Sequence, residues 1–225
     1  MCDECGCGDV KVDRSVNEVN DNVAHDNWHL LKDKEVLCVN IMGSPGSGKT
    51  SVIEGIAGFM KHLSVIQGDL ESDVDKRRLE KINIPTFQIN THSGCHLTAQ
   101  MIADALVNMS LKNYLLIENV GNLVCPAGVK LGQHVNLLVC STAEGSDKPK
   151  KYPHIFMDAD MIIISKMDIA DAVGFDEASF VADIKTINQK ARIITVTTKD
   201  KASFEPIYSF LEHRREHLIE HEHRH

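Results

Sequence analysis

The sequence is poor in aromatic residues, has no surplus of positive charge and contains no long apolar run. Of 225 residues only 5% are aromatic, one is tryptophan, and 24 lysines and arginines stand against 32 aspartates and glutamates. Nucleic-acid phosphates are bound by clustered lysine and arginine, so this composition predicts no nucleic-acid partner. A membrane span needs roughly 18 or more apolar residues and a signal peptide needs an apolar core, and the sequence has neither. We therefore expect a cytoplasmic protein without a membrane partner.

Cysteine, by contrast, is well represented, with seven residues. In a reducing compartment such cysteines indicate metal or catalytic chemistry before disulfides. Cys2, Cys5 and Cys7 lie together at the start of the chain. Their thiolates can enclose one metal ion, which is Ni²⁺ if the coordination is square-planar with sulfur and nitrogen, and Zn²⁺ if it is tetrahedral with sulfur. The alternative is a cysteine-containing end without function.

From residue 36 onward, short β-branched runs alternate with segments at helical spacing. The strand-like runs are Val36–Met42, Leu63–Gln67, Thr86–Asn90, Tyr114–Glu118, Val135–Ser141, Met161–Ser165 and Arg192–Thr197. The helical segments are Ser51–Lys61, Asp73–Ile82, His96–Met109, Glu177–Lys190 and Phe204–Glu216. This alternation predicts an α/β fold with a mostly parallel sheet and helices on both faces. We divide the chain into residues 1–33, a metal-binding extension and tether; residues 34–212, the α/β domain; and residues 213–225, a histidine-rich tail.

The clearest motif, G-x-x-x-x-G-K-[ST], runs from Gly43 to Thr50 between a strand-like and a helical segment. This context is the one that identifies a phosphate-binding loop, so the domain is predicted to be a P-loop NTPase. Backbone N–H groups surround the phosphates, Lys49 reaches the β and γ phosphates, and the Thr50 hydroxyl binds Mg²⁺. The residues expected to contact the nucleotide here are Gly43, Gly46, Ser47, Gly48, Lys49, Thr50 and Ser51.

Two acids follow predicted strands at the edge where ligands bind in open α/β sheets. They are Asp69, just beyond the run that ends at Gln67, and Glu118, at the end of the run that begins at Tyr114. We expect both to act with Lys49 in catalysis and to hold Mg²⁺ together with Thr50. The alternative for each is a loop carboxylate that caps the next helix.

The choice of base is indicated by Ser165-Lys166-Met167-Asp168, which resembles the N-K-x-D guanine motif of GTPases. In that motif the aspartate accepts from the guanine N1–H and amino group, whereas adenine offers no matching donors. Ser165 stands where asparagine is usual, and a serine makes only part of the asparagine contacts. Thr198 follows the next predicted strand and resembles the segment that touches the guanine carbonyl. Lys166, Asp168 and Thr198 therefore favour GTP over ATP.

A second group of soft ligands consists of Cys95, His96 and Cys125, with Cys95 and His96 expected to open a helix. Thiolate and imidazole together suit Zn²⁺ or Ni²⁺ better than Mg²⁺. Three ligands leave the site incomplete, so water, His92 or a second subunit would supply the rest. The alternative is that all three are core residues. Metal binding is favoured because Cys125 follows Glu118 closely, in a segment that would respond to the γ-phosphate.

With these residues the sequence resembles the HypB family, the nickel-binding GTPases of nickel-iron hydrogenase maturation. The segments that carry the resemblance are Met1–Cys7, Gly43–Thr50, Gly68–Leu70, Gly94–Leu97, Glu118–Pro126 and Ser165–Asp168. The resemblance implies a GTP-hydrolysing nickel metallochaperone that dimerises with nucleotide, works with a HypA-type metallochaperone and inserts nickel into the hydrogenase large subunit. It also implies a tight nickel site at Cys2, Cys5 and Cys7 and a nucleotide-linked nickel or zinc site at Cys95, His96 and Cys125.

Three other functions stay open. The nearest alternative is a nickel GTPase for urease maturation. That family has a Cys-Pro-His sequence at the core metal motif, whereas this sequence has Cys95-His96-Leu97. An ATP-dependent small-molecule kinase would share the P-loop but not the guanine motif. A metal storage protein with a vestigial nucleotide site would bind metal without regard to GTP. We expect slow hydrolysis, since no arginine finger is identifiable by spacing.

Overall fold

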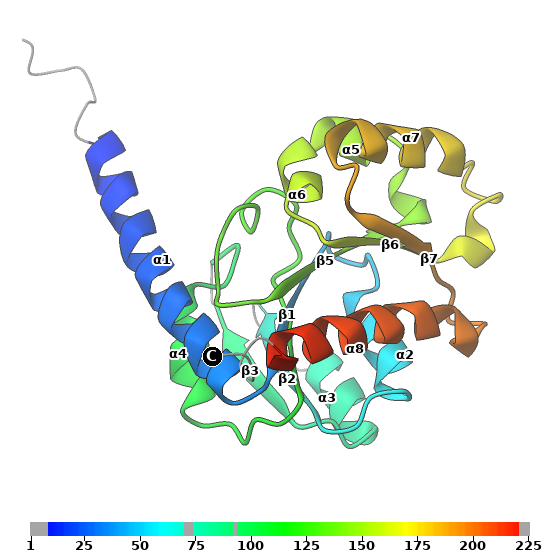
Figure 1. The fold of residues 1–225 in the computed structure, drawn as a ribbon. Coiled ribbons are helices and arrows are strands. Elements are labelled where there is room, and N and C mark those ends of the chain that lie inside the picture. The colour runs from blue at the N-terminus through cyan, green and yellow to red at the C-terminus, as the bar shows by residue number, and fades with distance from the viewer. Residues whose placement is uncertain (1–8, 70–73, 92–93, 221–225) are drawn as a thin grey trace, which may run out of the picture.

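The fold is a seven-stranded parallel sheet between two layers of helices (Figure 1). The computed structural model describes residues 9–69, 74–91 and 94–220. The strands are β1 (Leu37–Met42), β2 (Leu63–Asp69), β3 (Thr86–Asn90), β4 (Tyr114–Glu118), β5 (Val135–Ser141), β6 (Met161–Ser165) and β7 (Arg192–Thr195). Their order across the sheet is β3-β2-β4-β1-β5-β6-β7. The predicted α/β class and all seven strand positions are confirmed.

The helices are α1 (Asp9–Asp33), α2 (Lys49–Ala57), α3 (Val74–Lys81), α4 (Ala99–Leu106), α5 (Lys148–Lys151), α6 (Pro153–Met157), α7 (Glu177–Ile187) and α8 (Glu205–Glu220). Alternate residues of a strand point to opposite faces, so each face of the sheet has its own apolar core. In β1, Leu37, Val39 and Ile41 pack in the cluster shared with α2, α3 and α8. Cys38 faces the other way, toward α1 and α4, and Met42 toward α6 and α7. Every residue of β1 and β4 is buried, as expected for central strands covered on both faces.

The sheet order also fixes where a ligand can bind. Strand β1 lies between β4 and β5, and the chain leaves β1 directly into the P-loop. In open α/β sheets the crevice at the carboxyl ends of such central strands holds the ligand. The carboxyl ends of β1, β2, β4 and β6 therefore lie at one edge, which brings the predicted motifs together.

The predicted tether is part of a 25-residue helix, α1, which lies against the domain through its C-terminal half (Figure 1). Ala24, Asn27 and Leu31 form its buried stripe. The Asn27 amide donates to the carbonyl oxygens of Ala99 at 2.8 Å and Leu131 at 3.0 Å. Of the two interpretations of this stretch from the sequence, a tether or a short helix leading into the core, the structure has a helix, longer than expected and packed on the core.

Three further details differ from the sequence predictions. Helix α8 runs from Glu205 to Glu220 and therefore crosses the predicted boundary between residues 212 and 213. Cys95 and His96 do not open a helix, because α4 begins at Ala99, where the Thr98 hydroxyl accepts from the Met101 N–H at 3.3 Å. The short helices α5 and α6 were not predicted. Among the described helices, none combines the length and the apolar character required to cross a bilayer.

Candidate nucleotide and metal sites

The P-loop wraps the carboxyl end of β1 and leads into α2, as the motif predicts. Gly48 precedes α2 with φ of 99°, a left-handed conformation that glycine adopts without strain. A Cβ added at Gly43 would lie 2.4 Å from the Val139 carbonyl oxygen on β5, so this position accepts only glycine. Lys49 is 8% exposed, and its Nζ donates to the carbonyl oxygens of Gly43 and Ser44 at 3.2 and 3.1 Å. The ammonium group is thus held inside the loop that cradles phosphate in this motif.

The predicted magnesium ligands Thr50 and Glu118 come together beside the P-loop. Thr50 Oγ1 donates to Glu118 Oε1 at 2.7 Å, and Gln67 Nε2 donates to Glu118 Oε2 at 2.8 Å. Burial raises the pKa of the Glu118 carboxyl, whereas the hydrogen bond from Thr50 and the charge of Lys49 lower it. Carboxylate and hydroxyl oxygens are the ligands that Mg²⁺ prefers, so this donor set fits the ion. Asp69 ends β2, and its side chain lies outside the described part of the structure.

A cavity of about 410 Å³ opens beside these residues, and its lining includes Gln67 and Arg78, which were not predicted as site residues. Gln67 Oε1 is buried without a hydrogen-bond partner among the described residues, so it can accept from a bound group. Arg78 is held by Glu54 at 2.7 Å and Asp75 at 3.0 Å, and it adds a third cation to a cavity also lined by Lys49 and Lys166. The sequence signal for Gln67 was a polar residue within a buried strand. No sequence pattern indicated Arg78.

The predicted base-binding residues line a neighbouring cavity of about 280 Å³, among them Lys166, Asp168 and Thr198. Asp168 accepts from Thr197 Oγ1 and pairs with Lys199 Nζ, both at 3.0 Å. The hydrogen bond from Lys199, followed by that from Thr197, lowers the pKa of Asp168, so its carboxylate is an acceptor at neutral pH.

Two contacts join the base-binding loop to the P-loop. The Ser165 hydroxyl donates to the carbonyl oxygen of Ser47 at 2.6 Å, and Lys166 Nζ donates to that of Gly46 at 2.8 Å. Ser165 therefore has a structural role of its own at the position where asparagine is usual: it fixes the distance between the two halves of the nucleotide site.

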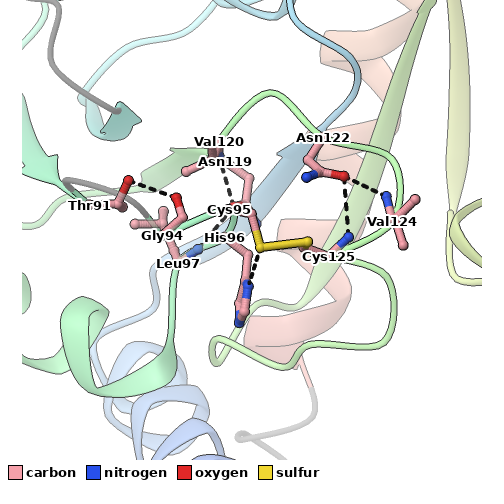
Figure 2. Close-up of a disulfide and its surroundings, with 10 residues drawn as sticks. All are labelled: Thr91, Gly94, Cys95, His96, Leu97, Asn119, Val120, Asn122, Val124 and Cys125. Carbon is pink, nitrogen blue, oxygen red and sulfur yellow. Dashed lines mark hydrogen bonds between the residues drawn. A yellow bond between two sulfur atoms is a disulfide. The ribbon is translucent and has the colours of Figure 1, made fainter.

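The core cysteine and histidine residues also converge, from two different loops (Figure 2). The ligand atoms of Cys95, His96 and Cys125 all lie within 4.8 Å of one another, and the three residues are half-buried. Cys95 Sγ lies 3.6 Å from His96 Nδ1. Two sulfurs and one imidazole nitrogen in this arrangement fit Ni²⁺ or Zn²⁺ and suit Mg²⁺ poorly.

The structure joins Cys95 and Cys125 in a disulfide, with 6.0 Å between their Cα atoms, which differs from the prediction of metal chemistry before disulfides. The same convergence that lets two sulfurs ligate one ion also lets them bond to each other. Only thiolates are metal ligands, so the disulfide and a metal complex are alternative forms of this pair.

Hydrogen bonds connect the Cys-His-Cys cluster to the nucleotide site. The Asn119 side-chain oxygen, one residue beyond Glu118, accepts from the Leu97 N–H at 3.3 Å (Figure 2). The Asn122 N–H donates to the Gly43 carbonyl oxygen at 3.1 Å, and the Asn122 side chain accepts from the Cys125 N–H at 3.3 Å. One continuous segment, residues 118–125, thus contacts the P-loop at its start and carries a candidate metal ligand at its end.

The remaining cysteines divide into two groups. Cys2, Cys5 and Cys7 lie outside the described residues, as does His92. Cys38 and Cys140 are buried in the core, and burial raises the pKa of both thiols. A thiol that stays protonated is neither a nucleophile nor a metal ligand, so these two are packing residues.

Comparison with known proteins points in the same direction as the geometry. Residues 37–195 match the family described as CobW/HypB/UreG, nucleotide-binding domain. The chain is 36% identical to "Hydrogenase/urease maturation factor HypB" of Helicobacter hepaticus over 92% of this chain and 88% of that protein. It is 37% identical to "Probable hydrogenase maturation factor HypB" of Methanocaldococcus jannaschii over 91% and 95%. A crystal structure of HypB from Helicobacter pylori in complex with nickel superposes with a TM-score of 0.85 at 36% identity, over 89% of this chain and 96% of that one.

Proposed function

Because this chain belongs to the CobW/HypB/UreG family, and within it to the HypB hydrogenase maturation factors, we propose that it is a GTP-hydrolysing nickel metallochaperone. It inserts nickel into the hydrogenase large subunit in the cytoplasm, together with a HypA-type metallochaperone. Nickel is its cargo, and GTP with Mg²⁺ controls when the cargo is held.

The selection of GTP rests on Asp168, whose ionised carboxylate lines the base cavity and matches the N1–H and amino donors of guanine. Thr50, Glu118 and, by its place at the end of β2, Asp69 are the residues that would hold Mg²⁺, which supplies charge stabilisation at the transferred phosphate. Lys49 faces the same phosphates. Hydrolysis is expected to be slow in the isolated protein, with stimulation by dimerisation or by a partner.

The single observation that carries the coupling of nucleotide to metal is the path through residues 118–125. Glu118 bonds to Thr50 of the P-loop, Asn119 bonds to Leu97 next to His96, and Asn122 bonds both to Gly43 and to Cys125. A shift of this segment on hydrolysis would move Cys125 relative to Cys95 and His96. Two arrangements of one segment, biased by the γ-phosphate, are the usual basis of such switches.

The proposal gives the two metal sites different tasks. Cys95, His96 and Cys125 hold nickel or zinc in a nucleotide-dependent way, with the open coordination positions filled by water or by a second copy of the chain. Cys2, Cys5 and Cys7 form the tight nickel site. Nucleotide-dependent dimerisation would bring two core sites together.

Equilibrium Ni²⁺ binding to the reduced full chain, with GDP and with a non-hydrolysable GTP analogue, tests the proposal. We expect the analogue to change the affinity or the number of bound ions, and we expect Cys125→Ser to abolish that difference. Cys140→Ser is the matched control, because Cys140 is a buried packing residue and is expected to leave the difference intact. Metal binding that ignores the nucleotide in the unmodified chain would instead indicate a storage protein.

A further inference from the structure

Two pairs of histidines on the surface share one geometry. On α1, His25 Nε2 and His29 Nε2 lie 3.1 Å apart, and on α8, His213 Nε2 and His217 Nε2 lie 3.2 Å apart. Both pairs are spaced i, i+4, which places the rings on one face of the helix. The His25 and His217 side chains are 71% and 55% exposed, so both pairs are open to solvent.

The nitrogen separations match those of two ligands bound to one ion. With a metal–nitrogen distance of about 2.0–2.1 Å, adjacent ligands are about 2.9 Å apart at a right angle and about 3.3 Å apart at a tetrahedral angle. The separations of 3.1 and 3.2 Å fall between these values. Imidazole nitrogen is a ligand for Ni²⁺, Zn²⁺ and Cu²⁺, and it is a poor one for Mg²⁺ or Ca²⁺.

A carboxylate lies near the second ring nitrogen of one histidine in each pair, beyond direct hydrogen-bond distance. His25 Nδ1 lies 3.9 Å from Asp26 Oδ1, and His217 Nδ1 lies 4.0 Å from Glu220 Oε2. Metal-bound histidines commonly direct the non-ligating N–H toward a carboxylate, which fixes the ring and strengthens the ligand. In both pairs the Nε2 atoms are thus turned toward each other while an acid stands on the Nδ1 side.

The two pairs are brought near one another by the ends of α1 and α8, which approach each other in Figure 1. The ring of Trp28 packs edge-on against His29, with 4.8 Å between ring centroids. Trp28 also lines a hollow of about 420 Å³ together with His213 and His217. The only tryptophan of the chain therefore contacts one pair and shares a hollow with the other.

From this geometry we propose that each pair, His25 with His29 and His213 with His217, binds one divalent transition-metal ion of the Ni²⁺ or Zn²⁺ class. The ion is held by two Nε2 atoms, and solvent completes its coordination. These sites share no ligand with the Cys-His-Cys cluster, and no hydrogen bond described above joins them to residues 118–125, so they are proposed to take no part in the nucleotide switch. A negative result for these sites would leave the GTPase proposal unaffected, and the reverse also holds.

Equilibrium dialysis of the reduced full chain against Ni²⁺ tests this assignment. We expect H29Q and H217Q each to lose one equivalent of bound Ni²⁺, equally with GDP and with a GTP analogue. H154Q is the matched control, since His154 is exposed on α6, away from both pairs. Deletion of residues 221–225 is expected to retain the α8 ion; its loss would assign that ion to the end of the chain instead of to the pair.

The fluorescence of Trp28 reports whether an ion binds near the histidine pairs, which the number of bound ions does not show. We expect Ni²⁺ to quench Trp28 emission, and we expect Zn²⁺, whose d shell is filled, to compete and restore it. H29Q is expected to remove most of the quenching. A pair whose substitution changes neither the stoichiometry nor the quenching is not a metal site. An equal loss in H154Q would mean that the binding is non-specific, and it would overturn both assignments.

Discussion

The phosphate half and the base half of the nucleotide site are built differently. In the phosphate half, Lys49, Thr50 and Glu118 are 8%, 5% and 5% exposed. Lys49 donates to a carbonyl oxygen of the P-loop, and Thr50 donates to Glu118. In the base half, the side chains of Asp168 and Lys199 are 22% and 72% exposed, and their ion pair faces water. The first half is positioned by desolvated hydrogen bonds, whereas the second is positioned by contacts that solvent and salt screen.

The difference teaches where a substitution should be costly. A buried polar group that loses its partner keeps the full penalty of its desolvation, whereas an exposed ion pair contributes little when it is broken. We therefore expect substitutions of the buried groups to change activity or stability strongly. Substitutions of the exposed groups are expected to change only which nucleotide is bound.

The largest effect is expected for Lys49→Ala. The substitution removes the ammonium group that faces the transferred phosphate, and loss of one such group typically lowers a rate by about 100-fold or more. Phosphate release from GTP under single-turnover conditions measures the change. Lys190→Ala is the control, because that lysine is exposed far from the P-loop. Hydrolysis by a folded K49A at the unmodified rate would show that the phosphate half is not the site of chemistry.

A half-buried group outside the nucleotide site, His134, provides an independent test of the same comparison. Burial lowers the pKa of His134 to about 4, and its Nδ1 accepts from the Cys38 N–H at 2.9 Å. The folded protein binds the His134 proton less readily than the unfolded chain does. The neutral imidazole therefore contributes its full stabilisation above about pH 6.5, and this stabilisation is lost as the pH falls toward 4. The linked change in the free energy of unfolding is on the order of 3 kcal/mol.

Urea unfolding of the full chain at several pH values between 7 and 4 measures this dependence. We expect His134→Asn to flatten the slope in that window and the exposed His154→Asn to leave it unchanged. An H134N protein with the unmodified slope would contradict the assignment of the pH dependence to the His134 imidazole.

The next effect in size concerns the base half. Asp168→Asn replaces a carboxylate that accepts two hydrogen bonds with an amide that presents a donor, so guanine is expected to bind about tenfold or more weakly. Xanthine, which has a carbonyl oxygen where guanine has its amino group, is expected to gain affinity. Competition between GTP and XTP for the full chain measures both changes, with the exposed Asp171→Asn as control. Weakened binding of both nucleotides to the same extent would argue against base recognition by Asp168.

The two halves also differ in how far the sequence predicts them. Lys49, Thr50 and Asp168 were found because local motifs fix their spacing next to strands, and Glu118 because it ends an apolar run. Gln67 has no motif around it, and its bond to Glu118 joins residues 51 positions apart. The pairing of Cys95 with Cys125 likewise depends on two loops that only the sheet order brings together.

Helix α1 shows why the sequence leaves a tether and a short helix as alternatives for a segment that packs on the core. Its buried stripe is narrow and includes Asn27, so the apolar periodicity that identifies an amphipathic helix is interrupted. The Asn27 amide is satisfied by carbonyl groups of Ala99 and Leu131, which are distant in sequence. Local pattern cannot reveal such partners, whereas the strands, of which β1, β4 and β6 are buried throughout, were located to within a few residues.

Ser165→Ala is expected to have the smallest effect, and it acts on the connection between the two halves. Ser165 is 5% exposed, and its hydroxyl donates to the Ser47 carbonyl oxygen of the P-loop. Loss of one neutral hydrogen bond costs about 1 kcal/mol of stability. Because the bond fixes the base-binding loop against the phosphate loop, KM for GTP is expected to rise severalfold while kcat stays nearly constant. The exposed Ser110→Ala is the control. A fall in kcat without a change in KM would mean that Ser165 positions the phosphate chemistry, and the two halves would then be a single unit.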